Sequence, residues 1–445
     1  MTLMMSVSGV RGIVGDSLTP ELAVRLASAF GTPLAGSTVV IGRDTRPSGD
    51  MLKSAVQAGL QGAGCRVVDL GVATTPGVAV MVRERSAAGG IVITASHNPS
   101  GWNGLKFLTA EGSALTARQA SAVFARFRDG PFAFASHDEC GEVERDLSAA
   151  NRHIVRVMQI VDAAAVRRRQ LNVVLDSING AGGASGRMLL EHLGCQVTHI
   201  NADAGGRFAH GPEPTAENLA GLGAAVRDNG ADVGFAQDPD ADRLAIVDDK
   251  GRYIGEECTL ALAARSVLSK TPGPVAANLS TSRMIDDIAR QFGAPAVVHR
   301  TAVGEANVVE AIRRHHCVLG GEGNGGVIDP RVVLVRDSLT SMALVLGLMA
   351  EDWRPVHHVV DDLPQYVMVK EKFDADRAGL GAWLERVRMS AEGGSINDMD
   401  GLRIDWPEGW VHVRGSNTEP VARVIAEAAD DRTARALIER VTQLR

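Results

Sequence analysis

A short acidic segment offers the clearest chemistry in this chain. Residues 231–235 form an apolar run, and Asp238-Pro-Asp-Ala-Asp-Arg243 follows it with a carboxylate at every second position. Carboxylates so spaced can converge on one hard cation that prefers oxygen ligands. An EF-hand is excluded, because its sixth and twelfth positions require Gly and Glu but hold Arg243 and Asp249. A surface turn is the alternative, although three unneutralised carboxylates would repel one another. The candidate Mg²⁺ ligands are Asp238, Asp240 and Asp242.

A serine in a polar loop is the candidate nucleophile. Residues 90–93 predict a buried strand, and Thr94-Ala-Ser-His-Asn-Pro-Ser-Gly101 follows it, so Ser96 leaves the edge of a sheet. Serine needs activation to attack an electrophile, and His97 and Lys106 are the nearby groups that could handle protons or phosphate charge. The chain contains no GxSxG elbow, which argues against a hydrolase of that type. Taken alone, the segment could also be a plain turn.

Two further loops have residue types suited to binding. Gly320-Gly-Glu-Gly-Asn-Gly-Gly326 matches GxGxxG, but Pro330 follows too closely for the helix that a dinucleotide site requires. We expect Glu322 and Asn324 of this loop to bind hydroxyl groups, with a glycine turn as the alternative. Arg414-Gly-Ser-Asn-Thr-Glu-Pro420 offers side chains and backbone N–H groups for a phosphate dianion, or else a helix cap. No Walker A sequence is present, which argues against a P-loop kinase.

One order of elements recurs three times and should position these loops. A strand, a polar loop, a helix and a second strand are predicted over residues 38–70, again over 171–200 and again over 274–299. Strands alternating with helices indicate βαβ units with mainly parallel sheets, whose ligand-binding loops leave the carboxyl ends of the strands. After residue 363 the pattern predicts strands at 366–370, 402–405 and 410–413 and helices at 374–390 and 431–444, a smaller α+β unit. The predicted domains are 1–150, 151–254, 255–364 and 365–445.

Composition limits the remaining possibilities. The net charge of −7 gives no support to nucleic-acid binding, so an enzyme acting on anions must gather its basic side chains locally. No segment is apolar over the length that spans a membrane, and no leader pattern is visible. The cysteines are few and lack CxxC pairs, which indicates free thiols and a reducing cytoplasm. They are Cys65, Cys140, Cys195, Cys258 and Cys317.

Together the four loops resemble those of the α-D-phosphohexomutase family, which includes phosphoglucomutases, phosphomannomutases and phosphoglucosamine mutases. The TASHNP segment at 94–99, the DPDADR segment at 238–243 and the RGSNTEP segment at 414–420 appear in the family's order, after an early Ser8-Gly-Val-Arg-Gly12 element. The resemblance covers essentially the whole chain. It implies three related mixed-sheet α/β domains and a smaller C-terminal α+β domain around a central cleft.

The same resemblance implies a mechanism and a set of roles. Ser96 would carry a phosphoryl group, and one Mg²⁺ per chain would bind that group together with the three aspartates. The phosphoserine would convert a hexose phosphate into a sugar 1,6-bisphosphate, which turns around and returns its other phosphate to Ser96. Arg11, Arg243 and Lys106 would neutralise the moving oxygens, with Lys106 and His97 as acid/base candidates. Glu322 and Asn324 would bind the sugar. The distant phosphate would contact Arg414, Ser416, Asn417, Thr418 and Arg423.

Departures from the family pattern bear on the substrate. Many relatives have Ser and then His in the sugar loop, where this chain has Asn324 and Gly326, and residues 301–305 lack a further His found in many of them. The GEGNGG form resembles the archaeal-type branch, which favours glucosamine 6-phosphate as substrate. A phosphomannomutase/phosphoglucomutase of dual specificity is the alternative, followed by a non-catalytic sugar-phosphate-binding protein and, more remotely, a dinucleotide oxidoreductase. We expect a monomer or homodimer that binds a small phosphosugar and neither nucleic acid nor membrane.

Overall fold

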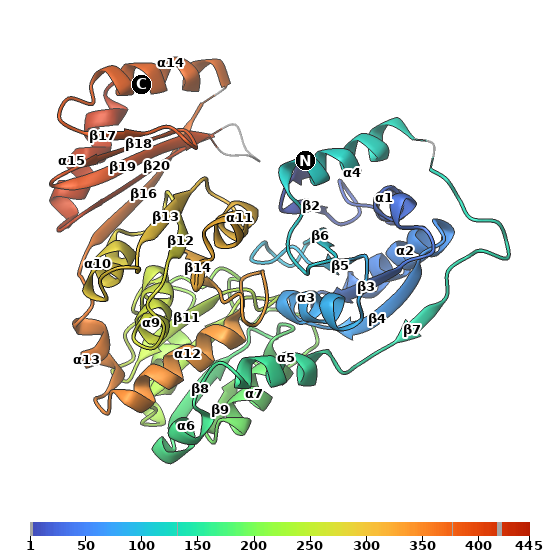
Figure 1. The fold of residues 1–445 in the computed structure, drawn as a ribbon, viewed down its shortest axis with the longest axis horizontal. Coiled ribbons are helices and arrows are strands. Elements are labelled where there is room, and N and C mark those ends of the chain that lie inside the picture. Colours follow the sequence, from blue (N-terminus) through green and yellow to red (C-terminus); the bar gives the residue numbers. More distant parts are fainter. Residues whose placement is uncertain (1–2, 131, 376, 416–420) are drawn as a thin grey trace.

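The computed structural model describes residues 3–130, 132–375, 377–415 and 421–445. Its strands form four separate sheets, each with its own helices (Figure 1). In this view the first sheet lies on the right and the fourth at the upper left, with the third below the fourth and the second toward the bottom of the molecule. The predicted fold class, three mixed-sheet α/β units followed by a smaller α+β unit, is confirmed. The predicted domain boundaries stay predictions. Among the described residues, no helix is both long and apolar enough to cross a bilayer.

The first unit contains a seven-stranded mixed sheet. Its strands, in sheet order, are β1 (Met4–Ser6), β2 (Gly9–Ile13), β6 (Trp102–Thr109), β5 (Gly89–Ile93), β3 (Thr38–Arg43), β4 (Arg66–Val72) and β7 (Val143–Arg145). Its helices are α1 (Pro20–Gly31), α2 (Gly49–Gly62), α3 (Thr75–Glu84) and α4 (Ala117–Asp129). Val39 and Ile41 of β3 belong to one core while Val40 belongs to another, as expected for a strand buried on both faces.

The second and third units repeat a smaller plan. Their sheets have the orders β11-β10-β8-β9 and β13-β12-β14-β15, each with three parallel strands and one antiparallel edge strand. The strands of the second unit are β8 (Asn172–Asp176), β9 (Gln196–Ile200), β10 (Val233–Gln237) and β11 (Leu244–Asp248). Those of the third are β12 (Val275–Asn278), β13 (Val298–Thr301), β14 (Leu319–Glu322) and β15 (Gly326–Ile328). The helices are α5 (Ala149–Met158), α6 (Ala163–Arg169), α7 (Gly183–His192), α8 (Ala220–Asp228), α9 (Glu256–Leu268), α10 (Met284–Gln291), α11 (Glu305–His315), α12 (Ser338–Glu351) and α13 (Val356–Asp361).

The recurring order predicted from the sequence is confirmed. β3–α2–β4, β8–α7–β9 and β12–α10–β13 are three βαβ units, and in each the two strands are parallel neighbours. The last strand of the third repeat, which from the sequence should occupy residues 296–299, begins only at Val298, because Gly293 with φ +66° and Pro295 lie in a turn before it.

The fourth unit is antiparallel throughout, as its separate sequence pattern indicates. Its sheet has the order β16-β20-β19-β18-β17, and the last helix packs on it through Leu437, Ile438 and Val441. The strands are β16 (Val367–Asp374), β17 (Ser395–Asn397), β18 (Leu402–Trp406), β19 (Gly409–Gly415) and β20 (Val421–Ala428), and the helices are α14 (Arg377–Met389) and α15 (Asp431–Thr442).

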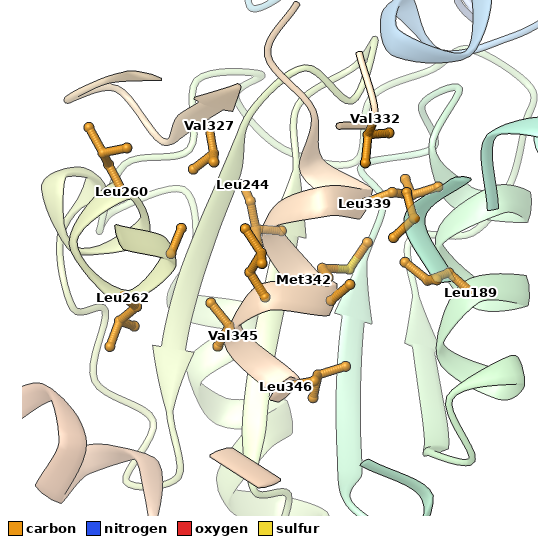
Figure 2. Packing of buried hydrophobic residues seen from close by; sticks show 14 of the residues in the cluster. Leu189, Leu244, Leu260, Leu262, Val327, Val332, Leu339, Met342, Val345 and Leu346 are labelled. Atoms are coloured by element: carbon orange, nitrogen blue, oxygen red, sulfur yellow. The ribbon is translucent and has the colours of Figure 1, made fainter. Parts of the chain in front are cut away.

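Helix α12 joins the second and third units through a shared core. Every residue from Ser338 to Ala350 is buried, so this helix is enclosed on all sides rather than amphipathic. Figure 2 shows Leu339, Met342 and Val345 of α12 packed beside Leu244 of β11. Asp337 caps the helix by accepting a hydrogen bond from the N–H of Leu339, which starts α12 immediately beside the acidic segment.

Candidate active site

Ser96 lies in a strained turn directly after β5. Its φ of +49° is in the left-handed region, which costs a non-glycine residue free energy and is found mostly at functional sites. The Ser96 N–H donates to Thr94 Oγ1 at 2.9 Å, and Ser96 Oγ donates to Asp238 Oδ2 at 2.9 Å. The candidate nucleophile of the first unit therefore contacts a candidate metal ligand of the second.

Arg46 donates hydrogen bonds to the backbone of the serine loop. Its fully buried guanidinium donates to the backbone carbonyls of Ser96, Asn98 and Pro99 at 2.6, 2.7 and 2.8 Å. Asp44, also fully buried, accepts from Arg46 Nε at 3.0 Å and from Thr94 Oγ1 at 2.6 Å. Neither charge is predicted as a site residue from the sequence, yet together they fix the backbone that presents Ser96.

The three aspartates converge in the tight connection between β10 and β11. One carboxylate oxygen from each of Asp238, Asp240 and Asp242 lies within 4.8 Å of the others, and all three side chains are buried. Ala241 between them has φ +57°, a left-handed turn that brings alternate side chains to one side. Burial and the charges of Asp242 and Asp240 raise the pKa of Asp238 well above its usual range.

This cluster fits a divalent cation. Asp240 Oδ1 and Asp242 Oδ1 are buried and have no hydrogen-bond partner among the described residues. A buried acceptor without a donor is costly unless something else neutralises it. Carboxylate oxygens without donors, next to a serine oxygen, are the ligands that Mg²⁺ prefers.

Lys106 of β6 faces the same cluster. Its Nζ donates to Asp240 Oδ2 at 2.6 Å and to Asp242 Oδ2 at 2.9 Å. Burial would lower the pKa of Lys106, but these two carboxylates outweigh it and raise the pKa, so the ammonium stays charged at neutral pH. Thr75, at the start of α3, donates its hydroxyl to Asp240 and was not predicted.

Three further predicted site residues surround Ser96 and the aspartates, namely Arg11, Arg243 and His97. β2 pairs with β6 so that Arg11 lies opposite Gly104, and Arg11 Nη1 donates to Asn98 Oδ1 at 2.9 Å. His97 Nδ1 lies 3.4 Å from Ser96 Oγ. The positive charge of Arg243, together with burial, lowers the pKa of His97 to about 2, so its imidazole is neutral at physiological pH.

The glycine-rich loop presents Glu322 at the end of β14. Glu322 Oε1 accepts from Asn278 Nδ2 at 2.9 Å and from the Gly304 N–H at 3.2 Å, and Oε2 accepts from Arg336 Nη1 at 2.8 Å. Asn324 Oδ1 accepts from the Gly326 N–H at 3.2 Å, so it also braces the loop. Arg336 was not predicted, and its only sequence signal is a charged residue between the apolar run 332–335 and an apolar helix.

The fourth unit contributes two arginines. Arg414 of β19 and Arg423 of β20 lie directly opposite one another, and like charges in that arrangement repel unless an anion or carboxylate intervenes. Arg414 Nε donates to Asp400 Oδ2 at 3.0 Å, while Arg423 Nε is buried with no partner among the described residues. The predicted phosphate ligands Ser416, Asn417 and Thr418 lie outside the described residues.

Family models match consecutive parts of this chain. They describe the α/β/α domains I, II and III and the C-terminal domain of phosphoglucomutase/phosphomannomutase, and they match residues 3–133, 151–251, 256–367 and 366–444.

Relatives of known name match over nearly their whole length. The phosphoglucomutase/phosphomannomutase of Thermococcus kodakarensis is 39% identical, covering 97% of this chain and 96% of the relative. The probable phosphoglucosamine mutase of Methanopyrus kandleri is also 39% identical, covering 97% and 95%. A crystal structure of a phosphoglucomutase/phosphomannomutase family protein from Burkholderia thailandensis superposes with a TM-score of 0.87 at 28% identity, covering 99% of this chain and 97% of the other. The chain belongs to the phosphoglucomutase/phosphomannomutase family.

Proposed function

We propose that this chain interconverts glucosamine 6-phosphate and glucosamine 1-phosphate, with Ser96 as the carrier of the phosphoryl group. The observation that carries the proposal is the contact of Ser96 Oγ with Asp238, within a buried cluster of three aspartates that Lys106 also faces. Phosphoryl transfer depends mainly on alignment and on neutralising charge, and this arrangement supplies both.

The first half-reaction moves a phosphoryl group from Ser96 to the free hydroxyl of the bound sugar phosphate. The bond between Ser96 Oγ and phosphorus breaks as the sugar oxygen attacks, which leaves a sugar 1,6-bisphosphate. The strained backbone at Ser96 and the Arg46 contacts keep Oγ aimed at the cluster. Lys106, Arg11 and Arg243 place positive charge around the moving oxygens. One Mg²⁺ per chain, held by Asp238, Asp240 and Asp242, would neutralise further charge on those oxygens when bound.

The second half-reaction returns the other phosphate to Ser96 after the bisphosphate turns around. Glu322 offers carboxylate oxygens that bind hydroxyl groups in either orientation of the sugar, and Asn324 lies beside it. Arg414 and Arg423 would hold whichever phosphate is distant from Ser96, together with Ser416, Asn417 and Thr418. The close opposition of the two arginines is relieved by a dianion placed between them.

Proton handling is assigned to Lys106. Its raised pKa keeps a proton at Nζ, which suits it to protonate the departing serine oxygen and then to take up the proton that the attacking sugar hydroxyl releases. In the second half-reaction the serine hydroxyl attacks, and the same exchange runs in reverse. His97 is close to Ser96 Oγ, but its pKa of about 2 keeps the imidazole uncharged at neutral pH, so it cannot act as an imidazolium acid there.

The choice of sugar rests on the relatives. Several proteins named as probable phosphoglucosamine mutases are 34–39% identical over almost the whole chain. The relative from Thermococcus kodakarensis at 39% identity is named phosphoglucomutase/phosphomannomutase, which favours dual specificity as the second candidate.

The test compares three substrates under one condition. The Mg²⁺-loaded protein receives a trace of glucose 1,6-bisphosphate, and interconversion of glucosamine, mannose and glucose phosphates is measured beside Ser96→Ala. We expect the highest kcat/KM on glucosamine phosphate and no turnover by the variant. A higher kcat/KM on mannose and glucose phosphates would establish the second candidate. Absence of turnover on every sugar, with the fold intact, would leave a sugar-phosphate-binding protein.

A further inference from the structure

Arg336 lies between the acidic cluster and the sugar loop. Its Nη2 donates to Asp242 Oδ2 at 2.7 Å and its Nη1 donates to Glu322 Oε2 at 2.8 Å. A third carboxylate, Glu305 at the start of α11, has Oε2 3.1 Å from Arg336 Nε. The arginine is 9% exposed. One guanidinium therefore joins the second unit's metal-ligand candidate to the third unit's sugar-binding candidate.

The backbone directly after Arg336 is anchored at two points. The Asp337 N–H donates to the Val327 carbonyl at 2.9 Å, and the Ser338 N–H donates to the Ala241 carbonyl at 3.2 Å within the acidic segment. A Cβ at Gly326 would come within 2.1 Å of Arg336 Cδ, so glycine is needed there for the arginine side chain to pass. Because the backbone beside it is tied to β15 and to the acidic segment, and Gly326 borders its path, the guanidinium is held between the two loops.

The shape of the guanidinium suits a link of this kind. Its planar fork donates two directed hydrogen bonds, whereas a lysine ammonium is a point charge that could not span both carboxylates in the same way. Asp242 also accepts from Lys106, and its Oδ1 receives no hydrogen bond from the described residues, so this carboxylate has an oxygen left for a cation. Because both carboxylates share one guanidinium, a change in the charge or hydrogen bonding of Glu322 alters the strength of the interaction between Arg336 and Asp242.

We propose that Arg336 is a positioning residue that transmits the state of Glu322 to the metal-ligating aspartate Asp242. A hydroxyl group that donates to Glu322 weakens the hydrogen bond between Glu322 and Arg336. The guanidinium then interacts more strongly with Asp242. Sugar occupancy is thereby coupled to the affinity of the acidic cluster for its cation. The identity of the group that binds Glu322 rests on the proposed function, but the link between the two carboxylates does not.

The experiment is a double-mutant cycle read out by Mg²⁺ binding, measured by isothermal titration calorimetry without any sugar. Glu322→Gln removes the charge that competes for Arg336. We expect it to weaken Mg²⁺ binding about fivefold or more when Arg336 is present, and about twofold or less in the Arg336→Met background. The change in Mg²⁺ affinity that remains without Arg336 is the direct effect of one lost negative charge. The additional change that requires Arg336 measures the coupling that passes through its guanidinium.

Two further variants sharpen the result. Arg336→Lys keeps the charge but not the fork, so we expect it to transmit as poorly as Arg336→Met, and it replaces that variant if the methionine protein does not fold. Arg331→Met removes a guanidinium that is close in the sequence but pairs with Asp329 instead, so there the full effect of Glu322→Gln should persist. An equal effect of Glu322→Gln with and without Arg336 would overturn the proposal. Failure of the proposed function would appear separately, as absence of mutase turnover by the unmutated protein.

Discussion

Replacing Arg46 with methionine should lower the local stability of the serine loop, with little effect on the rest of the chain. The guanidinium is the donor for the carbonyls of Ser96, Asn98 and Pro99 and the charge partner of Asp44. Methionine keeps much of the apolar volume but supplies no donor. The variant therefore leaves one buried carboxylate without its charge partner and three carbonyls without the Arg46 donor.

The magnitude follows from the burial of both charges. Asp44 and Arg46 are each 0% exposed, and removing one partner of such a pair costs about 3–5 kcal/mol. Asp44 keeps its bonds from Thr94 Oγ1 and from the Arg46 N–H, which places the expected loss near the lower end, about 3 kcal/mol. Arg43→Met is a matched control, because Arg43 pairs with Asp50, whose side chain is 70% exposed, and such pairs contribute about 1 kcal/mol or less.

Hydrogen exchange of individual amides is the suitable assay, because a chain of four units has no single unfolding free energy. The N–H groups of Thr94 and Asn98 donate within the loop region, to the carbonyls of Gly104 and Ala95. A loss of about 1.4 kcal/mol corresponds to a tenfold faster exchange. The expected loss therefore predicts that exchange of these amides accelerates about 100-fold in Arg46→Met and less than about tenfold in Arg43→Met. Mutase kcat should fall in the first variant only. Equal exchange rates in the two variants would refute the assignment of Arg46 as the support of Ser96.

Three other predictions concern stability, substrate and metal. Burial raises the pKa of Glu257 to about 8, above the usual 4.5, so its protonated form stabilises the fold fully below pH 4.5 and that stabilisation is lost as the pH rises through 8. Hydrogen exchange of α9 amides, compared at each pH, should show the unmutated protein losing about 3–5 kcal/mol of local stability relative to Glu257→Gln across this range, and a constant difference would contradict it. Asp400 accepts from the Val303 N–H at 2.9 Å and from Arg414, so Asp400→Ala should raise KM for the sugar phosphate about tenfold with a smaller change in kcat, and an unchanged KM would refute its role. Mg²⁺ at 100 times its Kd should stabilise the protein by about 2.7 kcal/mol and raise its Tm, whereas Asp240→Asn should remove most of that rise, and an equal rise in the variant would exclude Asp240 as a ligand.

The local chemistry was predictable because each site loop carries its reactive residues within a few positions of one another. Ser96, Asp238 and Lys106 could be named from loop composition and family resemblance, and the structure brings them together. The repeated strand–loop–helix–strand order placed the loops at the carboxyl ends of parallel strands, which also holds for Glu322 at the end of β14.

The supporting residues could not be predicted from their own neighbourhoods. Arg336 contacts Asp242, which is 94 positions away, and Arg46 contacts Ser96 at a separation of 50. The first contact depends on how two units pack and the second on which strands are neighbours in one sheet, whereas the local sequence shows only an arginine beside apolar or turn residues. Arg11 differs from them, because the family resemblance named it; the structure adds that it reaches the serine loop through the antiparallel pairing of β2 with β6. The roles of Ser416 and its neighbours stay predictions.

The central claim is that Ser96 carries the phosphoryl group between the two positions of the sugar. The direct measurement is to incubate the Mg²⁺-loaded protein with radiolabelled glucose 1,6-bisphosphate, digest it and identify the labelled peptide. Label on Ser96 that is released into hexose monophosphate at the rate of turnover is the predicted result. Turnover with no label on Ser96, or turnover that survives in Ser96→Ala, would contradict the account.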